Sequence, residues 1–122
     1  MWLRGVRGAT CATENSKSAI VETTKAMLLK IIEANEMQPD DIASAFFSTT
    51  RDLNAEFPAI AARQLGWKEV PLMCMHEMEV PNSLPLCVRV MVHWNTEKKA
   101  SEIRHVYING AERLRPDLIR EG

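Results

Sequence analysis

Arginines within apolar segments are the residues of this sequence best suited to chemistry. Nine of the 15 cationic side chains are arginines, and Arg7 and Arg89 each lie among valines and other apolar residues. Arginine carries a permanent, planar charge with five donors, which matches the geometry of carboxylates. Facing a pocket, such a side chain needs an anion, because an unpaired buried charge is costly. The same pattern also fits arginines that pair with carboxylates at a sheet rim, so both interpretations stay open.

Arg63 and Arg115 extend this set to four arginines on four predicted elements. Taken singly, each is typical of a solvated arginine or of one that interacts with a helix dipole. Taken together, they hint at a site for a polyanion. The glycine that follows Arg7, Gly8, is expected to leave room for a ligand to approach.

The segment around Cys74, His76 and Glu77 suggests two further chemistries. A metal site could use these residues with His93 or Cys87, but neither Cys-x-x-Cys nor His-x-x-x-His occurs, so we predict no metal. A Cys–His nucleophilic pair is the second alternative, although no residue that would orient the histidine is evident. The third reading is that Cys74 and Cys87 simply pack as small buried hydrophobes.

Tyr107 is the only tyrosine, and it is flanked by Val106 and Ile108. A lone tyrosine on a strand usually packs in the core or at its rim with a bonded hydroxyl. His105 alternates with Tyr107 and is expected to share its face. The chain contains neither a glycine loop for phosphates nor a dinucleotide fingerprint, so the motifs indicate no cofactor.

The elements that must position these residues follow the order β-α-β-α-β-β-β. We expect a first helix capped by Asn15 or Ser16, a short helix opened by Pro58 and closed by Gly66, and a strand at 42–50 buried on both faces. The strands are predicted at 3–11, 42–50, 70–75, 86–94 and 103–108, and the first helix ends near residue 35. This order predicts an α+β fold: a mixed β-sheet of about five strands with two helices on one face. The other face stays open, which favours an oligomer.

Length and composition indicate a single domain over residues 1–122. The formal net charge of −1 suggests neither nucleic acid nor an acidic membrane as a partner. No apolar run reaches the roughly 18 residues that span a bilayer, and the first residues do not resemble a signal peptide. The three cysteines lie far apart, which favours a reducing compartment and therefore a cytoplasmic protein.

Short segments spread along the chain carry a family resemblance. They are Arg4-Gly5-Val6-Arg7-Gly8-Ala9-Thr10, Asp52-Leu53, Phe57-Pro58-Ala59, Ala61-Ala62-Arg63, Val70-Pro71-Leu72, Cys74, Glu77-Met78, Cys87-Val88-Arg89-Val90, His105-Val106-Tyr107 and Leu114-Arg115-Pro116-Asp117-Leu118. Together, and in this order, they resemble the AroH-type monofunctional chorismate mutases. The resemblance covers essentially the whole chain, although Ile60 stands where some relatives have a lysine.

The resemblance implies a homotrimer of pseudo-α/β-barrel form with active sites in clefts between adjacent subunits. It implies an isomerase that converts chorismate to prephenate in phenylalanine and tyrosine biosynthesis, without a cofactor. A guanidinium aimed at the breaking C–O bond would stabilise the negative charge that develops on the ether oxygen.

The same resemblance implies roles for individual residues. Arg7 and Tyr107 would hold a substrate carboxylate, and Arg89 would reach the ether oxygen and a carboxylate. Glu77 and Cys74 would contact the ring hydroxyl. The remaining residues expected to bind substrate are Phe57, Ala59, Met73 and Leu114 in the pocket, with Arg63 and Arg115 near its mouth.

The main alternative is a trimer that binds small anions in the same cleft between subunits, either a non-catalytic protein or a deaminase-like one. Such a protein needs an arginine for a carboxylate, but it does not need Glu77, Arg89 and Tyr107 together.

Overall fold

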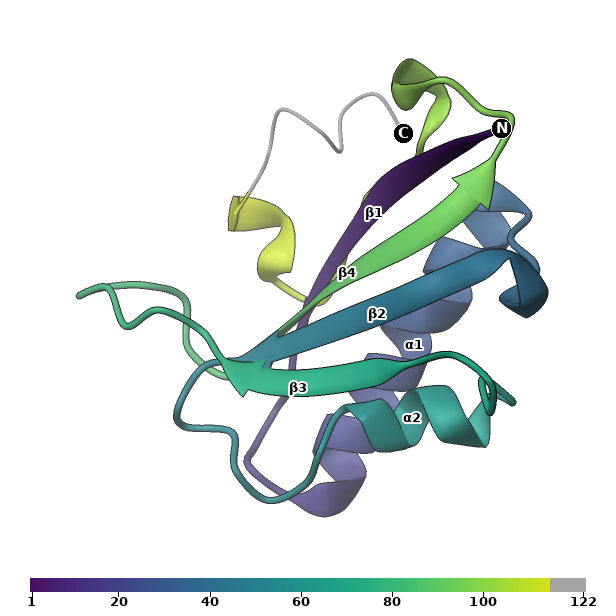
Figure 1. Ribbon diagram of the computed structural model, residues 1–122. Coiled ribbons are helices and arrows are strands. Elements are labelled where there is room, and N and C mark those ends of the chain that lie inside the picture. The colour runs from purple at the N-terminus through teal and green to yellow at the C-terminus, as the bar shows by residue number, and fades with distance from the viewer. Residues whose placement is uncertain (115–122) are drawn as a thin grey trace.

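The computed structural model describes residues 1–114 and confirms the predicted order of elements (Figure 1). The helices and strands are β1 Trp2–Cys11, α1 Lys17–Asn35, β2 Ile42–Thr49, α2 Ala59–Gln64, β3 Leu72–His76, β4 Cys87–Thr96 and β5 Val106–Tyr107. Short 3-10 helices occupy Pro39–Asp41, Ala100–Glu102 and Ala111–Leu114. Within residues 1–114, no helix is both long enough and apolar enough to cross a membrane.

The strands form one mixed sheet in the order β3-β2-β4-β1-β5. The β4 strand pairs antiparallel with β1 and β2, whereas β3 and β5 each pair parallel with their neighbour. Both α1 and α2 lie on the same side of this sheet (Figure 1). The predicted α+β fold, with two helices on one face, is therefore confirmed.

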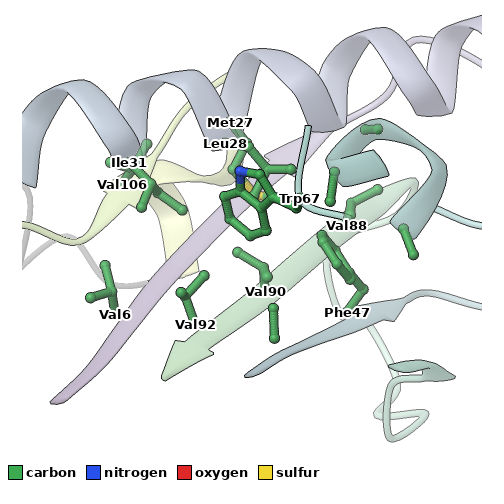
Figure 2. Packing of buried hydrophobic residues seen from close by; sticks show 14 of the residues in the cluster. Val6, Met27, Leu28, Ile31, Phe47, Trp67, Val88, Val90, Val92 and Val106 are labelled. Atoms are coloured by element: carbon green, nitrogen blue, oxygen red, sulfur yellow. The ribbon is translucent and has the colours of Figure 1, made fainter. Parts of the chain in front are cut away.

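The core lies between the sheet and the two helices. Alternate residues of β4 point to this side, and Val88, Val90 and Val92 are at most 4% exposed. Figure 2 shows the sheet residues Val6, Phe47, Val88, Val90 and Val92 facing Met27, Leu28 and Ile31 of α1, with Trp67 among them. Burial of a large apolar side chain contributes about 1.5–3 kcal/mol, so this layer holds the helices on one face and leaves the other face uncovered by them.

The boundaries of α1 follow from its caps. The Ser16 hydroxyl accepts a hydrogen bond from the Ala19 backbone N–H at 3.2 Å, as predicted. At the other end Glu36 adopts a left-handed conformation with φ 54°, which ends the helix after Asn35. The caps therefore fix both ends of the helix.

The last strand is shorter than predicted, because a buried side chain forms hydrogen bonds with the backbone N–H and carbonyl of residue 104. The Asn35 amide accepts a hydrogen bond from the Arg104 N–H and donates one to the Arg104 carbonyl, each at 2.9 Å. Neither backbone group of Arg104 is then available to a neighbouring strand. The strand expected over 103–108 is accordingly reduced to Val106–Tyr107.

Another expectation about the strands was wrong. The strand at 42–50 was expected to be buried on both faces, but Phe46 is 37% exposed and Ser48 is half-buried.

Gly8 has a packing role that the sequence did not indicate. A Cβ at Gly8 would lie 2.6 Å from Cδ1 of Ile31, so the missing side chain lets α1 pack closely on β1. Gly8 also lines a hollow beside Arg7, and the expectation that it leaves room for a ligand stays a prediction.

Candidate functional site

The uncovered face of the sheet carries the charged residues that the sequence pointed to. Residues paired across the strands form a row in which Arg89 of β4 lies between Ser48 of β2 and Ala9 of β1. Tyr107 of β5 pairs with Ala9 on its other side. Ala9 itself is fully buried in a small cluster with Tyr107 and Ala111.

Arg7 lies two residues from Ala9 along β1, so strand alternation places it on the same face. Glu77 directly follows β3 and reaches the row from the opposite side. A hollow of about 260 Å³ is lined by Arg7, Glu77, Arg89 and Tyr107, together with Ser48 and Met75 among others. We call this the cationic hollow, since two arginines face a single carboxylate in it.

Arg89 is held in a fixed direction by Glu77. Its Nη1 donates to Oε2 of Glu77 at 3.2 Å, and both side chains are about one-third exposed. The Ser48 hydroxyl also donates to Oε2, at 3.3 Å, and the Glu77 backbone N–H donates to the Thr49 carbonyl at 2.8 Å. Within residues 1–114, most of the guanidinium donors of Arg89 remain free to bind an anion.

The side chains of Arg7 and Tyr107 have no hydrogen-bond partner in the described part of the chain. Among residues 1–114, none accepts a hydrogen bond from the Arg7 guanidinium; only its backbone N–H is bonded, to Nδ1 of His105 at 2.9 Å. The Tyr107 side chain is 5% exposed, and within the described chain its hydroxyl has no hydrogen-bond partner. Buried polar groups are normally satisfied. A ligand with acceptor oxygens would satisfy both groups.

Cys74 and Phe57 line a second hollow, of about 340 Å³, which we call the Phe57 hollow. Cys74 lies on β3 two residues before His76 and pairs with the buried Phe47, so it points to the face that the helices cover. Met75 and His76 line both the Phe57 hollow and the cationic hollow. Within one protomer the two hollows are therefore neighbours, with Cys74 outside the cationic one.

The environment of Cys74 does not activate it as a nucleophile. Burial raises the pKa of the Cys74 thiol, and a hydrogen bond from the Ala59 backbone and the charge of Arg63 offset this only in part. The attacking species in cysteine chemistry is the thiolate. A thiol that stays protonated near neutral pH is better suited to packing or to a weak hydrogen bond.

The other predicted site residues lie around these hollows. Ala59 is buried at the start of α2, Arg63 is exposed on the same helix, and Met73 is 56% exposed on β3. Leu114 lines a third hollow, of about 250 Å³, together with Glu77 and Arg89. Arg115 lies outside the described residues.

The metal alternative finds no geometric support in the part of the chain that the structure describes. No group of three or more His, Cys, Asp or Glu side chains within residues 1–114 could hold a metal ion. Cys74 and His76 pair with the inward-facing Phe47 and Thr49, whereas Glu77 reaches Arg89 on the uncovered face.

Ser48 is a site residue that the sequence reasoning missed, and His76 was considered only for a metal or for a nucleophilic pair. We predicted that both faces of 42–50 are buried and therefore overlooked that Phe46 and Ser48 alternate with buried residues. This alternation puts Ser48 on the less buried face of β2, where it pairs with Arg89. The contact of His76 with Thr49 depends on strand pairing, which the sequence does not specify directly.

The fold and the cationic hollow together define an α+β protein built to bind a small anion. Comparison with known proteins identifies the family. Residues 3–118 match the family described as chorismate mutase type I, and the chain belongs to this family.

The similarity to individual proteins extends over nearly the whole chain. The chain is 46% identical over 117 residues to chorismate mutase AroH of Thermus thermophilus, covering 95% of this chain and 96% of that protein. It is 45% identical over 119 residues to chorismate mutase AroH of Bacillus subtilis, covering 97% and 94%. A solved structure of chorismate mutase from Clostridium thermocellum matches with a TM-score of 0.89 and 48% identity, covering 93% of this chain and 99% of that one.

Proposed function

We propose that this chain is an isomerase that converts chorismate to prephenate in the cytoplasmic biosynthesis of phenylalanine and tyrosine. Family membership supports the reaction. The observation that carries the site assignment is the buried Tyr107 hydroxyl, which has no partner among residues 1–114, together with the half-buried Arg7 beside the Arg89 guanidinium that Glu77 holds. Chorismate carries two carboxylates, which are the acceptors that such a site requires.

The reaction suits a site made of fixed cations. Chorismate rearranges in one concerted step, in which a C–O ether bond breaks as a C–C bond forms, so no proton is transferred and no nucleophile is needed. Negative charge develops on the ether oxygen in the transition state. A preorganised guanidinium near that oxygen stabilises the transition state more than the ground state.

Each polar residue of the cationic hollow then has a separate task. Arg89 contacts the ether oxygen and a carboxylate, while Arg7 and Tyr107 bind a carboxylate. Glu77 keeps Arg89 oriented through Oε2 and accepts a hydrogen bond from the ring hydroxyl. Holding the flexible side chain over the ring contributes further, because the two reacting carbon atoms are brought together.

The complete site forms between subunits of a homotrimer. Two observations favour this. Cys74 and Phe57 belong to a hollow separate from the cationic one. Phe57 and Met73 are also 67% and 56% exposed beside β3, which is an edge strand of the sheet. Large exposed apolar side chains at a strand edge are typical of an interface. The Phe57 hollow of one subunit, with Ala59, Arg63, Met73 and Cys74, would complete the cationic hollow of the next.

An assay with purified protein and chorismate tests the proposal. We expect the absorbance of chorismate to fall as prephenate forms without any added cofactor, with a kcat that stays flat between about pH 6 and 9, because no titrating group enters the chemistry. Binding of chorismate without its consumption would instead support the non-catalytic alternative. A steep change in kcat that followed titration of the Cys74 thiol would support a nucleophilic mechanism.

A further inference from the structure

The carboxylate of Glu77 accepts hydrogen bonds at both of its oxygens, and the two oxygens have different donors. Oε2 accepts from the Arg89 guanidinium at 3.2 Å and from the Ser48 hydroxyl at 3.3 Å. Oε1 accepts from the Met78 backbone N–H at 2.9 Å. A carboxylate oxygen offers roughly two acceptor positions. Within residues 1–114, Oε2 is therefore fully used, whereas Oε1 keeps a position for a ligand.

Glu77 itself lies beyond the regular part of the sheet. It follows the last residue of β3, and its backbone N–H donates to the Thr49 carbonyl at 2.8 Å. The residues that follow it, 78–80, belong to no helix or strand. A long side chain in such a segment can adopt several rotamers, and ordering it costs conformational entropy. Contacts with the sheet must therefore determine where the carboxylate lies.

Ser48 provides the most rigid of these contacts. Its strand, β2, is paired on both sides, and Ser48 lies between Met75 of β3 and Arg89 of β4. The serine side chain is short, with a single χ angle that places the hydroxyl, and it is half-buried here. The Arg89 side chain is much longer, so an anion that binds its remaining donors can shift it. The Ser48 hydroxyl then still holds Oε2.

We propose that Ser48 is a positioning residue that gives the two oxygens of Glu77 separate tasks. Oε2, anchored by Ser48, directs the Arg89 guanidinium toward the ether oxygen of the substrate, and Oε1 accepts the hydrogen bond from the ring hydroxyl. The inference rests on the proposed function, because it concerns the same reaction at the same site. Ser48 acts through Glu77 and does not contact the substrate.

The separate tasks of the two oxygens predict an effect on kcat rather than on KM. Arg89 meets the charge on the ether oxygen only as it develops in the transition state, so a misaligned guanidinium slows the chemical step. Oε1, which binds the ring hydroxyl, keeps its hydrogen bond from Met78 when Ser48 is changed. Arg7 and Tyr107 bind a carboxylate independently of Ser48. Ground-state binding should therefore change little.

Steady-state kinetics of Ser48→Ala and Ser48→Thr with chorismate test the inference. Ser48→Ala should lose about two- to tenfold in kcat, the range of an ordinary hydrogen bond, because Arg89 still contacts Oε2. KM and the melting temperature should stay close to those of the wild type. Ser48→Thr keeps the hydroxyl and should restore most of kcat. Ser44→Ala is the matched control, since Ser44 lies on the same strand but lines neither the cationic hollow nor the Phe57 hollow.

A double-mutant cycle shows whether Ser48 acts through Glu77. Glu77→Ala removes the carboxylate, so the addition of Ser48→Ala should cause no further loss in kcat. An equal loss in both backgrounds would overturn the positioning role. A Ser48→Ala variant with the kcat of the wild type would also overturn it, as would a folded Ser48→Thr variant as slow as Ser48→Ala.

These results are distinguishable from a failure of the proposed function. Each of them requires a wild type that consumes chorismate, so each would remove the role of Ser48 and leave the isomerase assignment intact. The absence of chorismate consumption by the wild type would overturn the proposed function and this inference together.

Discussion

The buried Tyr107 hydroxyl has no hydrogen-bond partner within residues 1–114, and this is the most informative feature at the scale of single residues. A buried hydroxyl without a partner lowers the stability of the free protein. Such a group is retained where function requires it. A change that removes it can then raise the stability of the protein while it lowers the activity.

Tyr107→Phe tests this opposition. Removing a hydroxyl that has no partner among residues 1–114 should leave the melting temperature of the free protein unchanged or slightly higher. The same change should raise KM for chorismate about ten- to a hundredfold, since a hydrogen bond to a charged group contributes about 1.5–3 kcal/mol. Thermal unfolding and steady-state kinetics measure the two effects. A clear loss of stability with normal KM would show that the hydroxyl has a structural role instead.

The alternation of residues along 86–94 was enough to place Arg89 on a face opposite the valines, and the structure has this arrangement. Alternation could not show that Glu77 pairs with Arg89. Glu77 follows β3 and Arg89 lies on β4, and β2 separates these two strands in the sheet. Nor could it show that Tyr107 lacks a partner. The prediction that Arg7, Glu77, Arg89 and Tyr107 share one site depended on the family resemblance, and these four residues line the cationic hollow whereas Cys74 lines the Phe57 hollow.

At the scale of elements, the helices and the strands of the central sheet followed from periodicity and capping residues. Ser16 capped α1 as expected. The predictions failed where a distant side chain replaced a strand partner, as Asn35 does for Arg104. They also missed the packing role of a glycine, since Gly8 lets α1 approach β1 and lines the cationic hollow as well. Both features depend on contacts between residues far apart in the sequence.

Gly8→Ala tests the close packing of α1 on β1. The added methyl group would meet Cδ1 of Ile31 at 2.6 Å and Cγ of Met27 at 3.1 Å, so we expect a loss of about 1–3 kcal/mol in the free energy of unfolding. Gly5→Ala is the matched control, since its nearest contact is the Sδ atom of Met91 at 3.1 Å, on a flexible side chain.

Denaturant unfolding of the single variants and of Gly8→Ala/Ile31→Val measures this effect. Shortening Ile31 removes the contacting methyl group, so the double variant should lose less than the sum of the two single changes. Additive losses would mean that the contact between Gly8 and Ile31 does not limit the packing of the helix.

At the scale of the whole molecule, the proposed site residues fall into two groups that line different hollows. The cationic hollow holds Arg7, Glu77, Arg89 and Tyr107, and the Phe57 hollow holds Phe57 and Cys74. The proposed site shared between subunits would account for this division and for the exposed side chains at the edge of β3. The residue pattern alone predicted only some oligomer, and the shared site was expected from the family resemblance.

Mixed trimers of two inactive variants test the shared site. Arg89→Ala inactivates the half of the site that the cationic hollow provides. Phe57→Asp inactivates the half that the Phe57 hollow provides, because it places a negative charge against the anionic substrate. When the two are coexpressed with different tags and purified as hybrids, about one third of the sites should combine two intact halves, since one of the three interfaces in each hybrid ring joins the intact half of one variant to that of the other. Activity near this level is expected. Hybrids without activity, although both tags are present, would show that each site lies within one subunit.

The central claim is that the guanidinium of Arg89 stabilises the ether oxygen as the C–O bond breaks. The most direct measurement is the kcat of Arg89→Ala with chorismate, alongside Arg51→Ala, which breaks an exposed ion pair with Glu79 outside the hollow. With the fold intact by circular dichroism, Arg89→Ala should lose about 10²–10³ in kcat, as for other preorganised donors, and Arg51→Ala should stay within about twofold of wild type. A folded Arg89→Ala variant with near-normal kcat would contradict the account.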